Sequence, residues 1–66
     1  MENNAKMIAR YQVSMNNVVD VAQLWRHGAD DYEIALENGD CSERGTFDQI
    51  AEVLTQYRFI KELEVQ

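Results

Sequence analysis

The segment Asn16–Gly28, NNVVDVAQLWRHG, decides which fold the sequence predicts. Apolar residues recur in it at the spacing i, i+3, i+4 and i+7, namely Val18, Val21, Ala22 and Trp25. This spacing is typical of one face of an amphipathic helix, because residues three and four apart lie on the same side of a helix. Asn17 can cap the N-terminus of such a helix, and Gly28 can end it in the left-handed conformation. The sequence therefore predicts a helix over this segment.

The residues on either side of this segment follow a different period. From Met7 to Met15 apolar and polar side chains alternate, with Ile8 as the only apolar exception. From Asp31 to Glu37 they alternate again. The apolar set of this second stretch is Tyr32, Ile34 and Leu36. A period of two is typical of a strand with one buried and one solvated face, so two strands are expected to flank the helix.

A second helix is predicted to begin after Gly45. Thr46, followed by Gln49 three residues later, matches the capping box of a helix N-terminus. The apolar side of this helix consists of Phe47, Ile50, Ala51, Leu54 and Tyr57. Residues 58–65 fit a strand, but Ile60 also continues the helical stripe. The sequence leaves that choice open.

These elements place the chain in the α+β class, or in a small α/β class, with the order β-α-β-α-β. Strands joined through a helix are usually parallel neighbours, so two helices are expected to pack on one face of a small three-stranded sheet. The last strand is the element that the sequence does not decide. Residues 1–66 are expected to form a single domain, with a disordered N-terminal tail over residues 1–5. The opposite face of the sheet would be exposed or used for assembly.

The composition excludes several kinds of protein. The single cysteine, Cys41, rules out an internal disulfide framework and a zinc site built from several cysteines, and it favours the cytoplasm. No apolar run approaches the ~20 residues that cross a bilayer, and the first residues lack the features of a secretory signal. A domain of 66 residues is small enough to need additional support, which makes a homodimer the expected state.

The charge is unevenly distributed along the chain. Residues 1–29 carry two acidic and three basic side chains, a net charge of +1, whereas residues 30–66 carry ten acidic and three basic side chains, a net charge of −7. Together these give the net charge of −6 of the whole chain. Such a balance disfavours direct binding of nucleic acid, whose phosphates are neutralised by basic side chains. It favours a partner protein with a basic surface.

An acidic face on the second predicted strand is the candidate partner-binding site. The residues assigned to it are Asp31, Glu33, Glu37, Asp40 and Glu43, with Trp25 and Tyr32 in support. On a strand, residues i and i+2 lie about 6.6 Å apart on the same side, which is near the spacing of successive backbone phosphates. Aromatic side chains are included because they are enriched at binding hot spots.

The sequence therefore predicts a small acidic interaction module without catalysis. Its predicted role is that of a regulator or inhibitor. It would block a basic surface of a partner, such as a nucleic-acid-binding surface, by acting as a nucleic-acid mimic. Phages and other mobile elements encode many such proteins, so a phage or mobile element is the expected source. The alternative is a structural protein that self-associates through a sheet face or an edge strand.

The loop Glu37–Gln49, ENGDCSERGTFDQ, has the outline of a calcium-binding loop that begins at its fourth residue. The fifth position of that outline holds Arg44, a cation, and the twelfth holds Ala51, which has no ligand atom, so calcium binding is not expected. Cys41 and His27 are the only thiol and imidazole, and no motif around them indicates a nucleophile. No enzyme activity, metal or cofactor is therefore expected.

Overall fold

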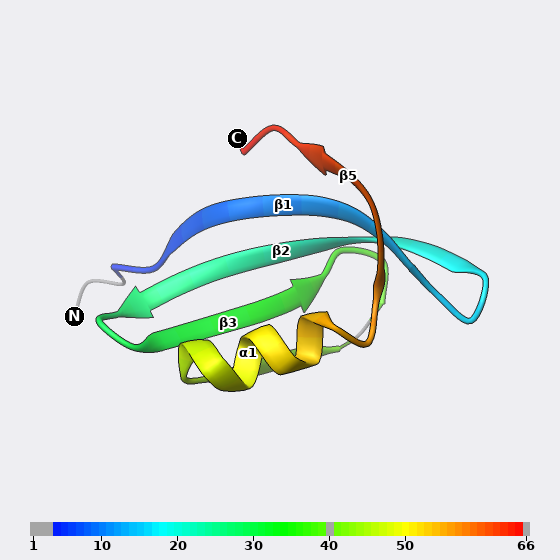
Figure 1. Cartoon of the computed structure of the whole chain (residues 1–66). Coiled ribbons are helices and arrows are strands. Elements are labelled where there is room, and N and C mark those ends of the chain that lie inside the picture. The colour runs from blue at the N-terminus through cyan, green and yellow to red at the C-terminus, as the bar shows by residue number, and fades with distance from the viewer. Residues whose placement is uncertain (1–3, 40, 66) are drawn as a thin grey trace.

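The protein folds as a five-stranded antiparallel sheet with one short helix on one of its faces (Figure 1). The computed structural model describes residues 4–39 and 41–65, and all statements about the fold concern these residues. The elements are β1 (Lys6–Met15), β2 (Val18–Gly28), β3 (Asp31–Leu36), β4 (Ser42–Gly45), α1 (Phe47–Leu54) and β5 (Arg58–Leu63). The strand order across the sheet is β4-β3-β2-β1-β5, so α1 carries the chain from one edge of the sheet to the other.

The predicted β-α-β-α-β order, with two helices on a three-stranded parallel sheet, is wrong. The segment predicted as the first helix forms β2, which is the central strand and pairs antiparallel with both β1 and β3. Its apolar residues lie on both faces of this strand, and a strand with apolar residues on both faces can imitate helical spacing. Ala22 lies on the face that α1 covers and is 1% exposed, whereas Trp25 lies on the opposite face.

The helix signals in this segment have a different structural meaning. Asn16 and Asn17 have positive φ values of 52° and 67°, and they form the two-residue turn between Met15 and Val18, which pair with each other. A two-residue hairpin turn of this kind needs left-handed backbone at both positions, and asparagine tolerates that conformation. Asn17 is therefore a hairpin residue rather than a helix cap. Gly28 ends β2 without a positive φ, so it is not a left-handed helix stop.

Three local predictions are confirmed. The alternating segments form β1 and β3, and α1 begins where the capping box places it. The backbone N–H of Gln49 donates to Thr46 Oγ1 at 3.3 Å, and the backbone N–H of Thr46 donates to Gln49 Oε1 at 2.9 Å. A side chain at Gly45 would collide with Gln49 Oε1, so the glycine leaves room for this reciprocal cap.

The end of the chain and one short strand complete the sheet. Residues 58–63 form β5, which pairs with β1, so the strand alternative is the correct one for this segment. Strand β4 was not predicted, because its four polar residues carry no apolar alternation, and it is held by pairing with β3. The predicted disordered tail covers residues 1–5, of which residues 1–3 lie outside the described part of the chain.

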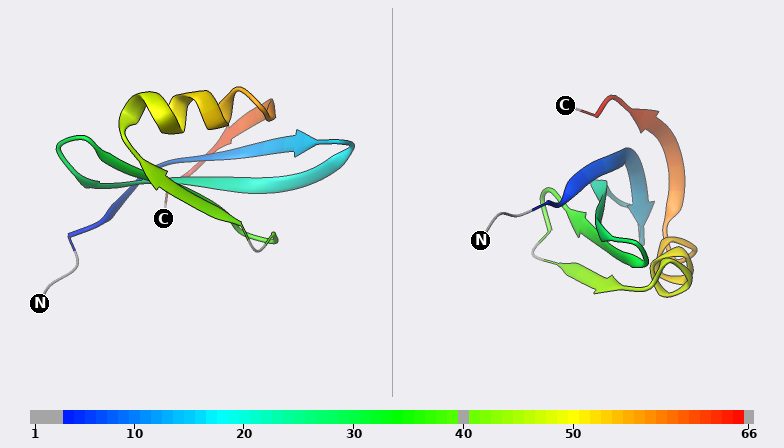
Figure 2. Two further views of the ribbon diagram at one scale, coloured as in Figure 1. Left: turned by 90° about the horizontal axis from the view of Figure 1, so that it is seen from below. Right: turned by 90° about the vertical axis from the view of Figure 1, so that its left-hand side faces the viewer.

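The core lies between α1 and the centre of the sheet. It is a small cluster of Val13, Ala22, Ile34 and Ile50, each at most 3% exposed. Ile50 is the only buried residue of α1. The helix packs against β3 and β4, and Figure 2 shows that the sheet curls so that α1 lies between β4 and β5 in the end-on view. The β1 side of this face is therefore less covered than the β3 side.

Candidate protein-interaction surfaces

The two faces of the sheet carry different side chains, because successive residues of a strand point to opposite sides. We call the face that α1 covers the helix side, and the opposite one the outer face. Ala22 and Ile34 are on the helix side, since both pack in the cluster with Ile50 of α1. The outer face carries Arg10, Gln23, Trp25, Glu33 and Glu37, together with other residues of the same register.

Glu37 is held in a chain of hydrogen bonds across the outer face. Arg10 donates to its carboxylate through Nε at 2.6 Å and through Nη2 at 3.0 Å, and Gln23 Nε2 donates at 2.8 Å. The indole N–H of Trp25 in turn donates to Gln23 Oε1 at 2.9 Å. The hydrogen bonds from Arg10 and then Gln23 lower the pKa of Glu37 to about 2. Trp25 therefore belongs to an outer-face network and lies outside the core cluster.

The other two carboxylates predicted on β3 also have partners within the chain. Glu33 Oε1 lies 2.7 Å from His27 Nε2. Asp31 receives hydrogen bonds from Arg44 Nε at 2.9 Å and Nη2 at 2.8 Å, and this pairing lowers the pKa of Asp31. Asp31, Glu33 and Glu37 do share one face, as predicted, but a cationic or imidazole side chain lies against each of them. That face is therefore much less acidic than the predicted site required.

The remaining predicted site residues are dispersed. Asp40 lies outside the described residues. Glu43 is exposed on β4 opposite Ile34, away from the outer-face carboxylates. Tyr32 lies on the helix side, where its ring meets Phe47 edge-on at 5.4 Å between centroids. The structure therefore brings Asp31, Glu33, Glu37 and Trp25 together on the outer face, and it places Tyr32 and Glu43 away from them.

Two further aspartates act in the fold itself. Asp20 accepts the backbone N–H groups of Val21 at 2.7 Å, Asn38 at 3.0 Å and Gly39 at 2.9 Å, which ties the loop after β3 to β2. Burial favours the neutral form of Asp20, but these amide donors outweigh it, and its pKa is lowered. Asp30 Oδ1 accepts the N–H of Phe47 at 2.9 Å, which adds a second contact at the start of α1.

An apolar groove lies open on the helix side, next to the part of β1 that α1 does not cover. One hollow of it, of about 270 Å³, is lined by Tyr11, Val13, Leu54, Tyr57 and Phe59. A second, of about 340 Å³, shares Val13 and Tyr57 with the first and extends to Met15, Val18, Leu36 and Cys41. Phe59, which is 58% exposed, meets Tyr11 edge-on at 5.6 Å. We call these two adjoining hollows the helix-side groove.

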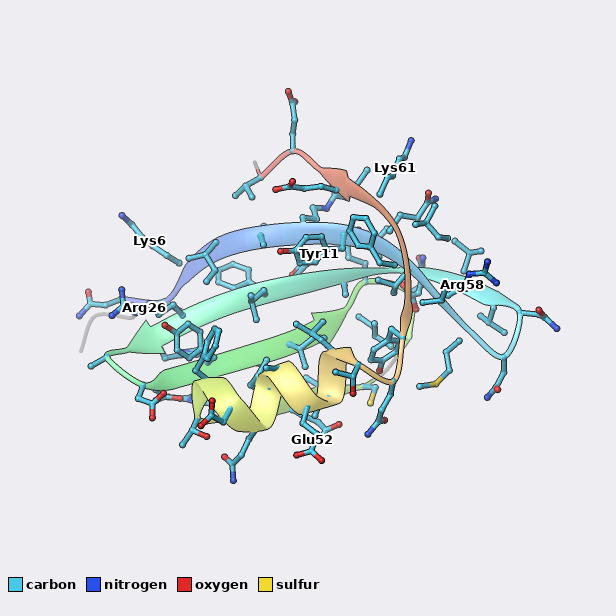
Figure 3. The ribbon with its side chains drawn as sticks, viewed as in Figure 1. Lys6, Tyr11, Arg26, Glu52, Arg58 and Lys61 are labelled. Atoms are coloured by element: carbon cyan, nitrogen blue, oxygen red, sulfur yellow. The ribbon has the colours of Figure 1, made fainter. Side chains whose placement is uncertain are left out.

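Carboxylates without an ion-pair partner among residues 4–39 and 41–65 lie beside this groove. Glu62 is the cross-strand neighbour of Tyr11. Glu43 lies close enough to Tyr57 to affect it: burial, then the charges of Cys41, Glu43 and Asp20, raise the pKa of Tyr57. Glu52 of α1 does not add to these charges beside the groove, because in Figure 3 its side chain points away from the sheet.

Sequence reasoning missed this groove because it depends on pairings between distant segments. Tyr11 and Phe59 are 48 positions apart and meet only because β5 pairs with β1. The signal that could have indicated it is the alternation within residues 58–65. This alternation predicts a strand that contains Phe59 and Glu62, but Ile60 also allowed the helix to continue.

Cys41 and His27 do not form a catalytic pair. Cys41 is exposed near the start of β2, beside Asp20 and Val18, whereas His27 lies at the other end of that strand. Asp20 and His27 are seven positions apart on β2, which is about 23 Å at the usual rise per residue. Within the described ranges no group of three or more His, Cys, Asp or Glu side chains is arranged to hold a metal ion.

Comparisons with protein-family models, with curated proteins and with solved structures find no match for this chain. The geometry of the two faces of the sheet is therefore what indicates a function. In the part of the chain that the structure describes, no helix has the length and apolar character needed to cross a membrane.

Proposed function

We propose that the protein is a small non-catalytic interaction module that binds a partner protein through the helix-side groove. The partner supplies a segment that combines apolar with basic side chains. By covering this basic surface, the protein acts as a regulator or inhibitor of the partner. The observation that carries the proposal is an apolar groove beside carboxylates that have no ion-pair partner among the described residues. A cytoplasmic location, expected from the single thiol, is part of the same proposal.

The groove has the composition of a binding hot spot. Its centre is aromatic and apolar, with Tyr11, Tyr57 and Phe59 around one hollow, and such side chains account for most of the energy of many interfaces. Glu43 and Glu62 are exposed beside it, where charges mainly increase the association rate and select the partner. On the outer face, by contrast, Arg10, His27 and Arg44 already occupy the carboxylates.

The apolar part of the proposal is tested with a pair of exposed phenylalanines. The full-length protein is used to capture its partner from the native host at low and high salt, and the purified partner is then titrated against variants. Phe59→Ala is expected to weaken binding by about thirtyfold, the loss of one hot-spot side chain. Phe47→Ala is the matched control, because Phe47 is 54% exposed but does not line the groove. Equal losses in both variants would contradict the groove as the binding site.

The charged part is tested by two double variants that change the net charge equally. Glu43→Gln with Glu62→Gln is expected to slow association and reduce its dependence on salt, as measured by stopped-flow mixing with the purified partner. Glu33→Gln with Glu37→Gln is expected to have a smaller effect, since both carboxylates are already paired. If the second double variant slows association more, the partner binds the outer face and the proposal is wrong.

Self-association through an edge strand is a second candidate, favoured by the exposure of β5. This strand is an edge of the sheet and pairs only with β1 among the described strands, and its Phe59 and Ile60 are 58% and 44% exposed. Unpaired edges with apolar side chains readily pair with another chain. Sedimentation at several concentrations tests it: a dimer that Ile60→Lys converts to a monomer supports assembly through β5. A monomer at all concentrations removes this candidate.

A further inference from the structure

A basic hollow lies at the end of the β1–β2 hairpin where β1 begins and β2 ends. Its volume is about 400 Å³, and the side chains that define its chemistry are Asn4, Lys6, Ile8, Arg26 and His27. No carboxylate lines it among residues 4–39 and 41–65, although the chain as a whole carries twelve acidic residues. Figure 3 shows Lys6 and Arg26 together at this end of the sheet, while Arg58 and Lys61 lie towards the other end.

Lys6 and Arg26 form a cross-strand pair of like charges. They are direct partners in the register of β1 and β2, and like charges in that position destabilise a sheet. Neither has an ion-pair partner among the described residues, in contrast to Arg10 and Arg44, each of which holds a carboxylate through two nitrogens. An anion between Lys6 and Arg26 would relieve this repulsion.

Arg26 is already oriented for such a contact. Its Nε donates to the carbonyl oxygen of Gly28 at 2.9 Å, and its guanidinium carbon lies 6.0 Å from the centre of the Tyr32 ring. These two contacts restrict the side chain while leaving the terminal nitrogens for a ligand. Because fewer rotamers are lost on binding, less of the binding energy is spent on ordering the side chain.

Two irregularities of the sheet meet at the same place. The register of β1 against β2 shifts between Met7 and Ala9, so Ile8 is the extra residue. The register of β2 against β3 shifts between Arg26 and Gly28, so His27 is the extra residue there. Both extra residues line the hollow. Such bulges redirect side chains and are over-represented next to functional sites.

We propose that this hollow binds the phosphate group of a phosphomonoester. The planar guanidinium of Arg26 matches two phosphate oxygens, and the ammonium of Lys6 adds a compact positive charge. The volume exceeds what the phosphate requires and leaves space for an attached organic group against Ile8. The phosphate can belong to a small metabolite or to a phosphorylated side chain of a partner protein.

The test is a titration of the full chain, followed by NMR of the backbone amides, with inorganic phosphate, phenyl phosphate and a phosphoserine peptide. Saturable shifts are expected at Lys6 and at residues 26–29. Lys6→Ala and Arg26→Ala are each expected to weaken binding about tenfold, as for one lost charge-assisted hydrogen bond. Lys61→Ala and Arg58→Ala remove the same charges elsewhere and are expected to leave the affinity unchanged, and thermal unfolding checks that all four variants fold.

The outcomes separate the two sources of the phosphate and also decide the proposal. Tighter binding of the peptide than of phenyl phosphate assigns the group to a partner protein, and the reverse assigns it to a small molecule. Shifts spread equally over Arg58 and Lys61, equal effects of all four variants, or no saturable binding of any of the three probes would each overturn the proposal.

Discussion

Replacing Ile50 by alanine tests whether the helix is anchored to the sheet by a single buried side chain. Ile50 is 3% exposed and contributes the only buried residue of α1 to the core cluster. The change removes three carbon atoms, worth about 2.4 kcal/mol at ~0.8 kcal/mol each, and leaves a cavity that adds to the loss. We expect the free energy of unfolding to fall by about 3 kcal/mol. A domain of this size has only about 3–10 kcal/mol in total, so the variant is expected to be near the limit of stability.

The assay is urea unfolding followed by far-ultraviolet circular dichroism and by Trp25 fluorescence. With a slope of about 1 kcal/mol per molar urea, the midpoint is expected to fall by about 3 M, if the protein remains folded without urea. Ile50→Val covers the case in which it does not, with an expected loss of about 1 kcal/mol. Ile60→Ala is the matched control, because the same atoms are removed from a side chain that is 44% exposed. Equal losses at Ile50 and Ile60 would refute the packing described above.

Three further predictions concern the turn, an ion pair and the groove. Asn17→Gly is expected to raise the free energy of unfolding by up to about 1 kcal/mol, because glycine adopts a φ of 67° without strain; a lower thermal midpoint would contradict the turn. Arg10→Ala is expected to raise the pKa of Glu37 from about 2 towards 4.5 in an NMR titration, since the arginine is the main cause of the shift. Because folding lowers the pKa of Glu37, its ionised carboxylate stabilises the fold at pH values above 4.5, and this stabilisation is lost as the pH falls towards about 2. The variant lacks this stabilisation and is therefore expected to unfold at a higher pH on acidification. An unchanged pKa of Glu37 would contradict the pairing. Glu43→Gln is expected to lower the pKa of Tyr57 in an ultraviolet titration while leaving it above 10.0, because burial is the larger cause; no change would mean that Glu43 does not lie near the groove.

The candidate site could be predicted only in part, because some of its features follow from the local sequence and others from contacts between distant segments. That Asp31, Glu33 and Glu37 share one face follows from the alternation of a single strand, and the structure agrees. That each is paired depends on partners from β1, β2 and β4, whose positions relative to β3 are not encoded in the spacing of β3 itself. An acidic stretch of sequence therefore forms an acidic surface only where no basic side chain of a neighbouring strand pairs with its carboxylates.

The elements whose signals are local could be predicted from the sequence alone. The alternation of residues 7–15 and 31–36 specified strands, and the capping box at Thr46 specified the start of α1, because each depends on residues within a few positions of one another. That Asn16–Gly28 forms a turn and a central strand depends instead on contacts with distant parts of the chain. Its apolar residues satisfy helical spacing, yet β1 and β3 pair with its backbone on both sides and the sheet carries side chains on both of its faces. That pairing needs partners outside the segment, so no period measured within the segment could distinguish strand from helix.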